Sequence, residues 1–341
     1  MGLIESFSEP MLLTGALLAT IGGTAAYRLF AIRRGIVANP NFRSLHQRPI
    51  PRGGGIVFSF VFLCAVAIQW LAAAVDTSLT LALVIGGAIA TLSGFVDDVM
   101  EIPAQAKLVI QIGLAVWVLF CFGGQPLLNL PWTPSIVDLA LSGLALVWLM
   151  NLYNFMDGTD GMAASGAVFF CLASTLSLAL TGDDGSLMFV LSLLALCSLG
   201  FLVQNWPPAR IFMGDSGSLF LGYCFGALIA KTVTTGQISM WTWLIIFGYF
   251  VGDTTTTTLL RMVLVKRWYR AHRSNAYQNV ARICGSHLRV VRGVSLYHVL
   301  WLFPLAMWSV LVPSAAPLAT VLAFAPVIVW TYRFGPRLSS S

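Results

Sequence analysis

The sequence predicts an all-α polytopic membrane protein with a single domain, and two observations lead to this prediction. First, 58% of the 341 residues are hydrophobic and only 9% are charged, a balance that excludes an ordinary soluble globular domain. Second, the apolar residues fall into runs of about 20, the length that an α-helix needs to cross a bilayer. We find no internal repeat and no low-complexity segment, so residues 1–341 are expected to form one integral membrane domain.

About eleven runs are expected to form transmembrane helices. The first run lacks the small-residue cleavage site of a signal peptide, so we interpret it as a retained helix. The eighth run is the shortest. The runs cover residues 10–32, 53–75, 78–96, 106–123, 134–152, 161–181, 186–204, 217–232, 240–264, 294–312 and 315–333.

The basic residues predict the orientation. Most of them follow odd-numbered spans, on the side of the C-terminus, whereas Asp76, Asp183 and Asp184 lie in the opposite loops, where Lys231 alone is basic. By the positive-inside rule, the N-terminus is expected in the periplasm and the C-terminus in the cytoplasm. The basic residues are Arg33, Arg34, Arg43, Arg48, Arg52, Lys266, Arg267, Arg270, Arg273, Arg282, Arg289, Arg292, Arg333 and Arg337.

The segment PIPRGGGI lies at the start of the second span, and it is the first of five polar clusters that this topology places on the cytoplasmic side. Its glycines allow the backbone to approach a ligand or another helix closely. His46, Arg48 and Arg52 could contact phosphate. The alternative is a basic juxtamembrane loop that leads into a glycine-rich helix start.

A pair of carboxylates, Asp97 and Asp98, closes the third span. A carboxylate inside a bilayer costs roughly 2.5–3.5 kcal/mol on insertion scales, so this pair needs a cation, a basic partner or water. Adjacent carboxylates suit Mg²⁺, which keeps waters and substrate phosphates as its other ligands. One of the pair could instead position or deprotonate a nucleophile. A solvated helix end is the simpler interpretation, but it does not explain why Lys107 follows so closely.

The segment NLYNFMDGTDG joins the fifth and sixth spans. Asn151 and Asn154 lie one helical turn apart, so their amides could share a face and read a base or a sugar. Asp157 and Asp160 follow, between glycines that favour turns. Either carboxylate could cap the sixth span, which would leave the other for chemistry.

The segment NWPPARIFMGDSG precedes the eighth span. Asp215 could cap that helix, or it could join Asp97 and Asp98 as a third carboxylate of a cation site. The ring of Phe212 could stack on a base or pack at an interface, and the residues alone favour packing.

The loop of residues 265–293 carries His272 and several arginines, Arg273 among them. Arginine makes bidentate contacts with phosphate, so the loop could neutralise a pyrophosphate and a lipid phosphate, or anchor the protein at the membrane. We expect both roles, for different residues. Because the basic residues lie beside a membrane, the net charge of +6 favours anionic lipid and phosphate partners over nucleic acid.

Asp253 lies inside the ninth span, in the segment GYFVGDTTTTTLLRM. An intramembrane carboxylate is a functional hypothesis by default. The neighbouring residues 254–258 or Arg261 could satisfy it, and we favour a structural contact between helices.

The six cysteines have neither metal-ligand spacing nor a disulfide pattern.

Four motifs resemble those of the polyprenyl-phosphate N-acetylhexosamine-1-phosphate transferases. This family makes the first lipid intermediate of peptidoglycan and starts O-antigen or teichoic acid synthesis. The motifs occur in the family's order, and the resemblance covers nearly the whole chain, from the PRGGG loop through the eleventh span. They are FVDDVMEIPAQAKL, NLYNFMDGTDGMA, NWPPARIFMGDSGSLFLG and HRSNAYQ.

The resemblance implies transfer of a sugar-1-phosphate from a UDP-N-acetyl sugar to undecaprenyl phosphate in the bacterial inner membrane, with release of UMP. It also implies a need for Mg²⁺, for which Mn²⁺ could substitute, and it is compatible with a homodimer. Asp97 matches the position proposed to activate or bind the lipid phosphate, Asp98 its catalytic or metal-associated neighbour, and Asp215 the Mg²⁺ ligand. The positions matching nucleotide-sugar contacts are Lys107, Asn154, Asp157, Asp160, Asn205 and Phe212, and the expected phosphate contacts are His46, Arg52, His272 and Arg273.

The HRSNAYQ segment resembles the HRSHAYQ version seen in O-antigen-initiating enzymes rather than the triple-histidine loop of the peptidoglycan enzyme. A UDP-N-acetylated 6-deoxyhexose donor is therefore expected rather than UDP-MurNAc-pentapeptide. Asn275 stands where the pattern has its second histidine. Because asparagine does not titrate, phosphate binding through that position is in doubt.

Two other classes of protein fit the sequence less well. A transporter or flippase of a polyprenyl-linked sugar would place ionisable groups near the bilayer midplane and often shows repeated halves. Here Asp253 alone is central and no repeat is visible. A CDP-alcohol phosphatidyltransferase would need a DGxxAR-type pattern, which the segment DGTDGMAAS does not supply.

Overall fold

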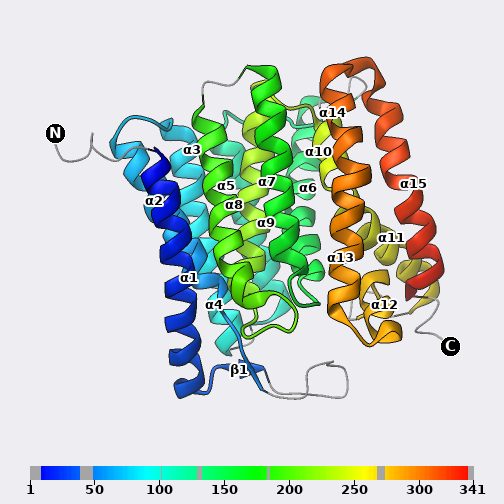
Figure 1. Cartoon of the computed structure of the whole chain (residues 1–341). Coiled ribbons are helices and arrows are strands. Elements are labelled where there is room, and N and C mark those ends of the chain that lie inside the picture. Colours follow the sequence, from blue (N-terminus) through cyan, green and yellow to red (C-terminus); the bar gives the residue numbers. More distant parts are fainter. Residues whose placement is uncertain are drawn as a thin grey trace.

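The computed structural model describes residues 9–38, 49–100, 102–128, 133–182, 185–266 and 273–336, which form a helical bundle with one short hairpin at its lower end in Figure 1. The helices are α1 (Glu9–Arg34), α2 (Gly55–Leu71), α3 (Thr77–Leu81), α4 (Gly87–Met100), α5 (Ala104–Cys121), α6 (Ser135–Met156), α7 (Met162–Thr181), α8 (Ser186–Asn205), α9 (Asp215–Thr234), α10 (Met240–Ile246), α11 (Gly248–Leu264), α12 (Ala276–Cys284), α13 (His287–Tyr297), α14 (Phe303–Leu311) and α15 (Ala316–Phe334). Short π-helical turns join α3 to α4 and α13 to α14, so each pair runs as one continuous rod.

The predicted all-α membrane fold is confirmed. Within the described ranges, nine helical segments are long and apolar enough to cross a membrane. Of the other two predicted spans, the second corresponds to α2, which has 17 residues, and the ninth is divided into α10 and α11 at Phe247. The total of about eleven crossings and the orientation stay predictions.

The bundle exposes large apolar side chains on its outer helices, as expected for a surface that faces lipid. Phe120 of α5 is 72% exposed and Val263 of α11 is 84% exposed. Helix α9 lies at the centre instead, with Phe220 and Phe225 fully buried against the surrounding helices.

Small residues let the neighbours of α9 approach it closely. A Cβ atom at Gly55, the first residue of α2, would collide with the backbone of Gly217 in α9, and one at Gly94 of α4 would collide with the backbone of Asp215. The expectation that the PRGGG glycines permit close approach is therefore confirmed for Gly55, whose neighbour is another helix. These crossings fix the first turn of α9 between α2 and α4.

One local feature was not predicted, and one local expectation is wrong. Residues 37–38 and 50–51 pair as a small antiparallel hairpin, β1 (Val37–Ala38) with β2 (Ile50–Pro51), which the sequence did not suggest. The expectation of a loop throughout residues 265–293 is wrong, because this stretch contains α12 and the first turns of α13. Ser286 caps α13 by accepting a hydrogen bond from the Arg289 amide, and α12 buries Tyr277 and Ala281 on one face.

The polar motifs lie at one end of the bundle, the lower end in Figure 1. Helices α4, α6 and α8 end there and α5, α7 and α9 begin there, so the loops that join them meet. The expectation that the motifs share one side of the protein is confirmed for the described residues.

Asp253 of α11 makes the structural contact that we favoured. Its carboxylate accepts hydrogen bonds from the backbone amides of Ala276 and Tyr277 at 3.0 and 3.4 Å. The hydroxyls of Thr257 and Thr331 donate to it as well, at 3.3 and 3.1 Å. Asp253 thereby holds α12 and α15 against α11, and α12 in turn contacts the candidate site.

Candidate functional site

The start of α9 is tied to the end of α4 by Asp98. The carboxylate of Asp98 accepts hydrogen bonds from the backbone amides of Asp215 at 3.0 Å and Ser216 at 3.2 Å. These amides have no partner within α9, because the first amides of an α-helix lack a carbonyl one turn earlier. A carboxylate at this position is also favoured by the helix dipole. Asp98 therefore acts as a cap supplied by another helix.

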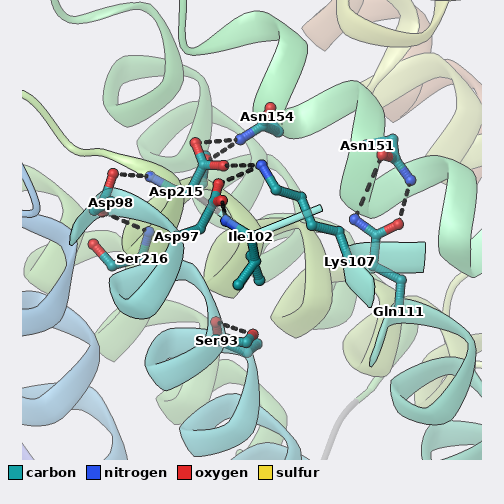
Figure 2. Close-up of polar contacts among 12 residues, drawn as sticks. Ser93, Asp97, Asp98, Ile102, Lys107, Gln111, Asn151, Asn154, Asp215 and Ser216 are labelled. Carbon is teal, nitrogen blue, oxygen red and sulfur yellow. Dashed lines mark hydrogen bonds and ion pairs between the residues drawn. The ribbon is translucent and has the colours of Figure 1, made fainter. Parts of the chain in front are cut away.

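Lys107 of α5 lies between the carboxylates of Asp97 and Asp215, as Figure 2 shows. Its ammonium group forms a short ion pair with Asp97 and a longer one with Asp215, at 3.5 Å. Asp97 is held further by the backbone amide of Ile102, at 2.9 Å. The expectation that Lys107 serves as a basic partner of the acidic pair is therefore confirmed for Asp97.

Asn154 fixes the orientation of Asp215. Its side-chain amide donates to Asp215 Oδ1 and to the Ser218 hydroxyl, both at 2.9 Å. Asn151, one turn earlier on α6, donates to Gln111 of α5 at 2.7 Å instead. The two asparagines share a face as expected, and both use their amides to bind protein groups in this structure.

These groups line a pocket of about 60 Å³ that includes Asp97, Lys107, Asn154 and Asp215. A water molecule occupies about 30 Å³ in the liquid, so this volume suits an ion and a little water rather than a whole nucleotide sugar. The donor set fits Mg²⁺, because oxygen atoms of Asp97 and Asp215 already converge on one positive charge, the ammonium of Lys107. No group of three or more His, Cys, Asp or Glu side chains in the described part of the chain has a metal-binding arrangement of its own.

The prediction that Asp98 joins Asp215 as a metal ligand gains no support from the contacts of Asp98. Both oxygens of Asp98 face backbone amides, and the side chain is nearly buried. Asp97 takes the place beside Asp215. The positions of Asp97 and Asp98 differ in this way because neighbouring residues on a helix point about 100° apart.

The alternative interpretation that Asp157, Asp160 or Asp215 caps a helix is wrong. Asp215 is the first residue of α9, and its side chain contacts Lys107 and Asn154 rather than its own helix. Helix α7 begins after Gly161 and has no side-chain cap, so neither Asp157 nor Asp160 caps it.

Asp157 lies between α6 and α7, close enough to Asp98, Asp160 and Asp215 for their negative charges to act on it. Although the residue keeps part of its surface exposed, protein atoms fill most of the space around its carboxyl group. Burial raises the pKa of Asp157 well above its ordinary value, and the negative charges of Asp215, Asp98 and Asp160 raise it further.

Asp160 and Asn205 hold neighbouring loops together. One oxygen of Asp160 accepts from the backbone amide of Ala209, and the other lies 2.9 Å from Nδ1 of His287. The Asn205 amide, only 2% exposed, accepts from the Gly161 amide and donates to the Ile211 carbonyl. These bonds shape the loop before α9, and the predicted uridine contacts of both residues stay predictions.

Phe212 is bound to the PRGGG segment through its backbone. Its amide donates to the Pro51 carbonyl at 2.8 Å, and its carbonyl accepts from the Gly54 amide at 3.0 Å. The residue is partly exposed. The proposed stacking stays a prediction.

Tyr277 of α12 contacts the DGTDG loop, which comprises residues 157–161 between α6 and α7. Its hydroxyl donates to the Phe155 carbonyl at 2.6 Å and accepts from the Gly158 amide at 2.9 Å. The residue is fully buried. Helix α12 therefore supports the loop that carries Asp157 and Asp160, although the contact involves no charged group.

The expected phosphate-binding residues are only partly described. Arg52 lies close enough to Asp98 for its positive charge to act on that carboxylate, and Arg273 is exposed beside α12. His46 and His272 lie outside the described residues. Asn275 is only 2% exposed, and among the described residues its amide nitrogen has no hydrogen-bond partner, so this position faces the interior.

Sequence reasoning missed three residues of this region: Gln111, Tyr277 and His287. Gln111 follows Lys107 by one helical turn, so the helical period could have found it. The contacts of Tyr277 and His287 with the DGTDG loop join residues more than 100 positions apart, and a single sequence carries no signal for them.

Comparisons with known proteins identify the family of this chain. The family model "Glycosyl transferase family 4" matches residues 80–233. The chain is 34% identical over 263 residues to the probable undecaprenyl-phosphate N-acetylglucosaminyl 1-phosphate transferase of Bacillus subtilis, covering 74% of this chain and 71% of that protein. The chain belongs to the polyprenyl-phosphate N-acetylhexosamine-1-phosphate transferase family.

Two further members of the transferase family show how broadly the likeness extends. The decaprenyl-phosphate N-acetylglucosaminephosphotransferase of Mycolicibacterium smegmatis is 36% identical over 251 residues, which are 67% of this chain and 60% of that protein. The phospho-N-acetylmuramoyl-pentapeptide-transferase of Moorella thermoacetica is 36% identical over 201 residues, 54% of this chain and 62% of that protein. The part that matches the transferase family model contains Asp97, Lys107 and Asp215.

Proposed function

We propose that this protein transfers an N-acetylated sugar-1-phosphate from a UDP-sugar to undecaprenyl phosphate and releases UMP. The observation that carries the proposal is the convergence of Asp97, Asp215 and Lys107 in one small polar pocket at an end of an apolar bundle. The names of the relatives support the same reaction, since each acts on a polyprenyl phosphate or transfers a phospho-sugar.

In the proposed reaction, an oxygen of the lipid phosphate forms a bond to the phosphorus that carries the sugar, and the bond from that phosphorus to UMP breaks. Asp97 and Asp215 are the residues that would hold Mg²⁺, which when bound neutralises phosphate charge and favours in-line displacement. Asn154 orients Asp215 by a hydrogen bond at 2.9 Å. Lys107 adds a second positive charge beside the reacting phosphates.

The remaining residues position these groups. Asp98 holds the first turn of α9, so that Asp215 faces Lys107. Arg52, whose charge reaches Asp98, lies on the segment that leads into α2, where it could meet a phosphate of either substrate. An active site that faces the cytoplasm of the bacterial inner membrane would give both substrates access.

The donor sugar that we propose is an N-acetylated 6-deoxyhexose, with O-antigen or a related surface glycan as the end product. The support is the HRSNAYQ segment, which resembles the loop of O-antigen-initiating enzymes. Its residues Ser274 and Asn275 precede α12, and Ala276 to Gln278 form the first turn of that helix, which contacts the DGTDG loop through Tyr277. The residues that select the sugar would therefore lie next to the pocket that contains Asp97 and Asp215, called the carboxylate pocket below.

The test is release of UMP by purified protein given undecaprenyl phosphate, Mg²⁺ and a panel of UDP-N-acetyl sugars. We expect UMP and a lipid-linked sugar in equal amounts, and no turnover by Asp215→Asn, which should insert and fold as the unchanged protein does. Ser78→Ala, at the opposite end of the bundle, is the matched control. Absence of UMP release with every sugar, or full activity of Asp215→Asn, would refute the proposal.

A further inference from the structure

An aspartate and a histidine from distant parts of the chain form a pair beside the DGTDG loop. Asp160 Oδ1 and His287 Nδ1 lie 2.9 Å apart, and the two side chains are only 12% and 16% exposed. The second oxygen of Asp160 is held at 2.9 Å by the backbone amide of Ala209. The imidazole at the start of α13 is thus held in a fixed orientation.

The contacts assign the proton of this imidazole. A distance of 2.9 Å between Nδ1 and a carboxylate oxygen is attractive only when Nδ1 carries the hydrogen. The backbone amide of Asp160 also points at Nδ1, but from 3.3 Å, and the shorter contact decides. Nε2 of neutral His287 then carries a lone pair and accepts hydrogen bonds.

Nε2 is available to a ligand. Within the described part of the chain, no hydrogen bond reaches it, whereas Nδ1 is engaged. His287 and Asp160 line an open pocket of about 300 Å³, together with Pro207, Pro208 and Ala209. This volume is at the lower end of the range for small-molecule sites, and the proline rings give it flat apolar walls.

The pocket lined by Asp160 and His287 is placed to receive the base of a nucleotide. Asp160 follows Asp157 by three residues, and Asp157 is close enough to Asp215, Asp98 and Asp160 for their charges to act on it. The carboxylate pocket itself, about 60 Å³ in volume, has no room for a base. A donor whose phosphates lie at Asp97 and Asp215 would therefore extend its base into the neighbouring pocket.

We propose that His287 determines the base specificity of this enzyme by accepting, at Nε2, the N3–H of uracil. The inference rests on the proposed function, because it takes a uridine nucleotide as donor. Uracil presents a hydrogen-bond donor at N3, whereas cytosine presents a lone pair there. A fixed acceptor at Nε2 would therefore bind uracil and repel cytosine, and Asp160 would be the positioning residue that keeps Nε2 an acceptor.

The ligand-side test uses the unchanged protein. Binding of UMP, CMP and N3-methyl-UMP to the purified protein is measured by titration calorimetry. We expect UMP to bind at least about tenfold more tightly than the other two, because both leave Nε2 without a donor. N3-methyl-UMP that binds as tightly as UMP would overturn the inference without any variant being made.

The protein-side test separates reading of the base from support of the loop. His287→Asn places an amide nitrogen near Nδ1, so it keeps the bond to Asp160 but removes Nε2. We expect it to lose the preference for UMP over CMP while its melting temperature stays near that of the unchanged protein. Ser295→Ala, about two turns further along α13 and outside this pocket, is the matched control and should keep the preference.

The outcomes distinguish the two proposals. If the unchanged protein releases no UMP from any UDP-sugar, the proposed function fails. If it does release UMP and His287→Asn still prefers UMP over CMP to the same degree, only the role of His287 is wrong.

Discussion

Asp98, at the end of α4, accepts hydrogen bonds from the backbone amides of Asp215 and Ser216 at 3.0 and 3.2 Å. One carboxylate of the acidic group thus caps the helix that carries another. The arrangement explains why two adjacent aspartates are present: Asp98 holds α9 in place, and Asp97 faces Lys107.

The first prediction follows from this division of roles. Asp98→Ala should lower the stability of the protein by about 1–2 kcal/mol, the usual effect of losing a helix cap. Asp97→Ala should lower it less, because its removal also relieves repulsion with Asp215. Thermal unfolding of both purified variants checks this, and equal losses would contradict the capping role of Asp98.

The second prediction concerns competition between Lys107 and a metal ion. The ammonium of Lys107 lies between Asp97 and Asp215, where it repels a second cation. Lys107→Gln should therefore bind Mn²⁺ more tightly, by about tenfold or more, as measured by electron paramagnetic resonance without substrate. Gln111→Glu would serve as a control that adds negative charge one turn away. Weaker Mn²⁺ binding by Lys107→Gln would show that the metal does not use these oxygens.

The third prediction concerns the hydroxyl of Tyr277. Tyr277→Phe leaves the Phe155 carbonyl and the Gly158 amide without this partner, so we expect a loss of about 1–3 kcal/mol in stability and weaker UMP binding. Tyr297→Phe is the matched control, since Tyr297 also donates to a backbone carbonyl, that of Ala323. The control should lose stability but bind UMP normally. UMP binding that is unchanged in Tyr277→Phe would show that the contact between α12 and the loop does not support the nucleotide site.

The fourth prediction is a pH dependence at Asp157. Its pKa in the folded protein is raised, so the folded state keeps a proton that the unfolded chain releases near pH 4. Stability is therefore lost as pH rises from about 4 through the raised pKa. Asp157→Asn has no proton to lose, so its melting temperature should exceed that of the unchanged protein, and by more at pH 8 than at pH 5. A gain that shrinks as pH rises would contradict the shift.

The fifth prediction concerns topology. If the polar end of the bundle faces the cytoplasm, single cysteines at Thr181 or Thr235 should react with an impermeant thiol reagent in intact cells. Cys284 at the end of α12, kept as the single cysteine, should react only after the membrane is opened. All three positions have solvent access in the described structure. Labelling of Cys284 in intact cells would place the site on the opposite side.

The local sequence determined the helices and the main members of the site. Runs of apolar residues must form helices in a membrane, because a helix satisfies every backbone polar group within one segment. The boundaries of the same runs place Asp97, Lys107, Asn154 and Asp215 at helix ends. Helix α12 was missed because its nine residues are amphipathic and too short to stand out as a span.

Only the tertiary structure decided what each polar side chain does. Asp97 and Asp98 are chemically identical neighbours, and the crossing of α4 over the start of α9 makes one a partner of Lys107 and the other a helix cap. The pairing of Asp160 with His287 likewise depends on how α13 packs beside the DGTDG loop. Hydrogen bonds act only over about 3 Å, so contacts between residues far apart in the chain are set by packing, which one sequence does not display.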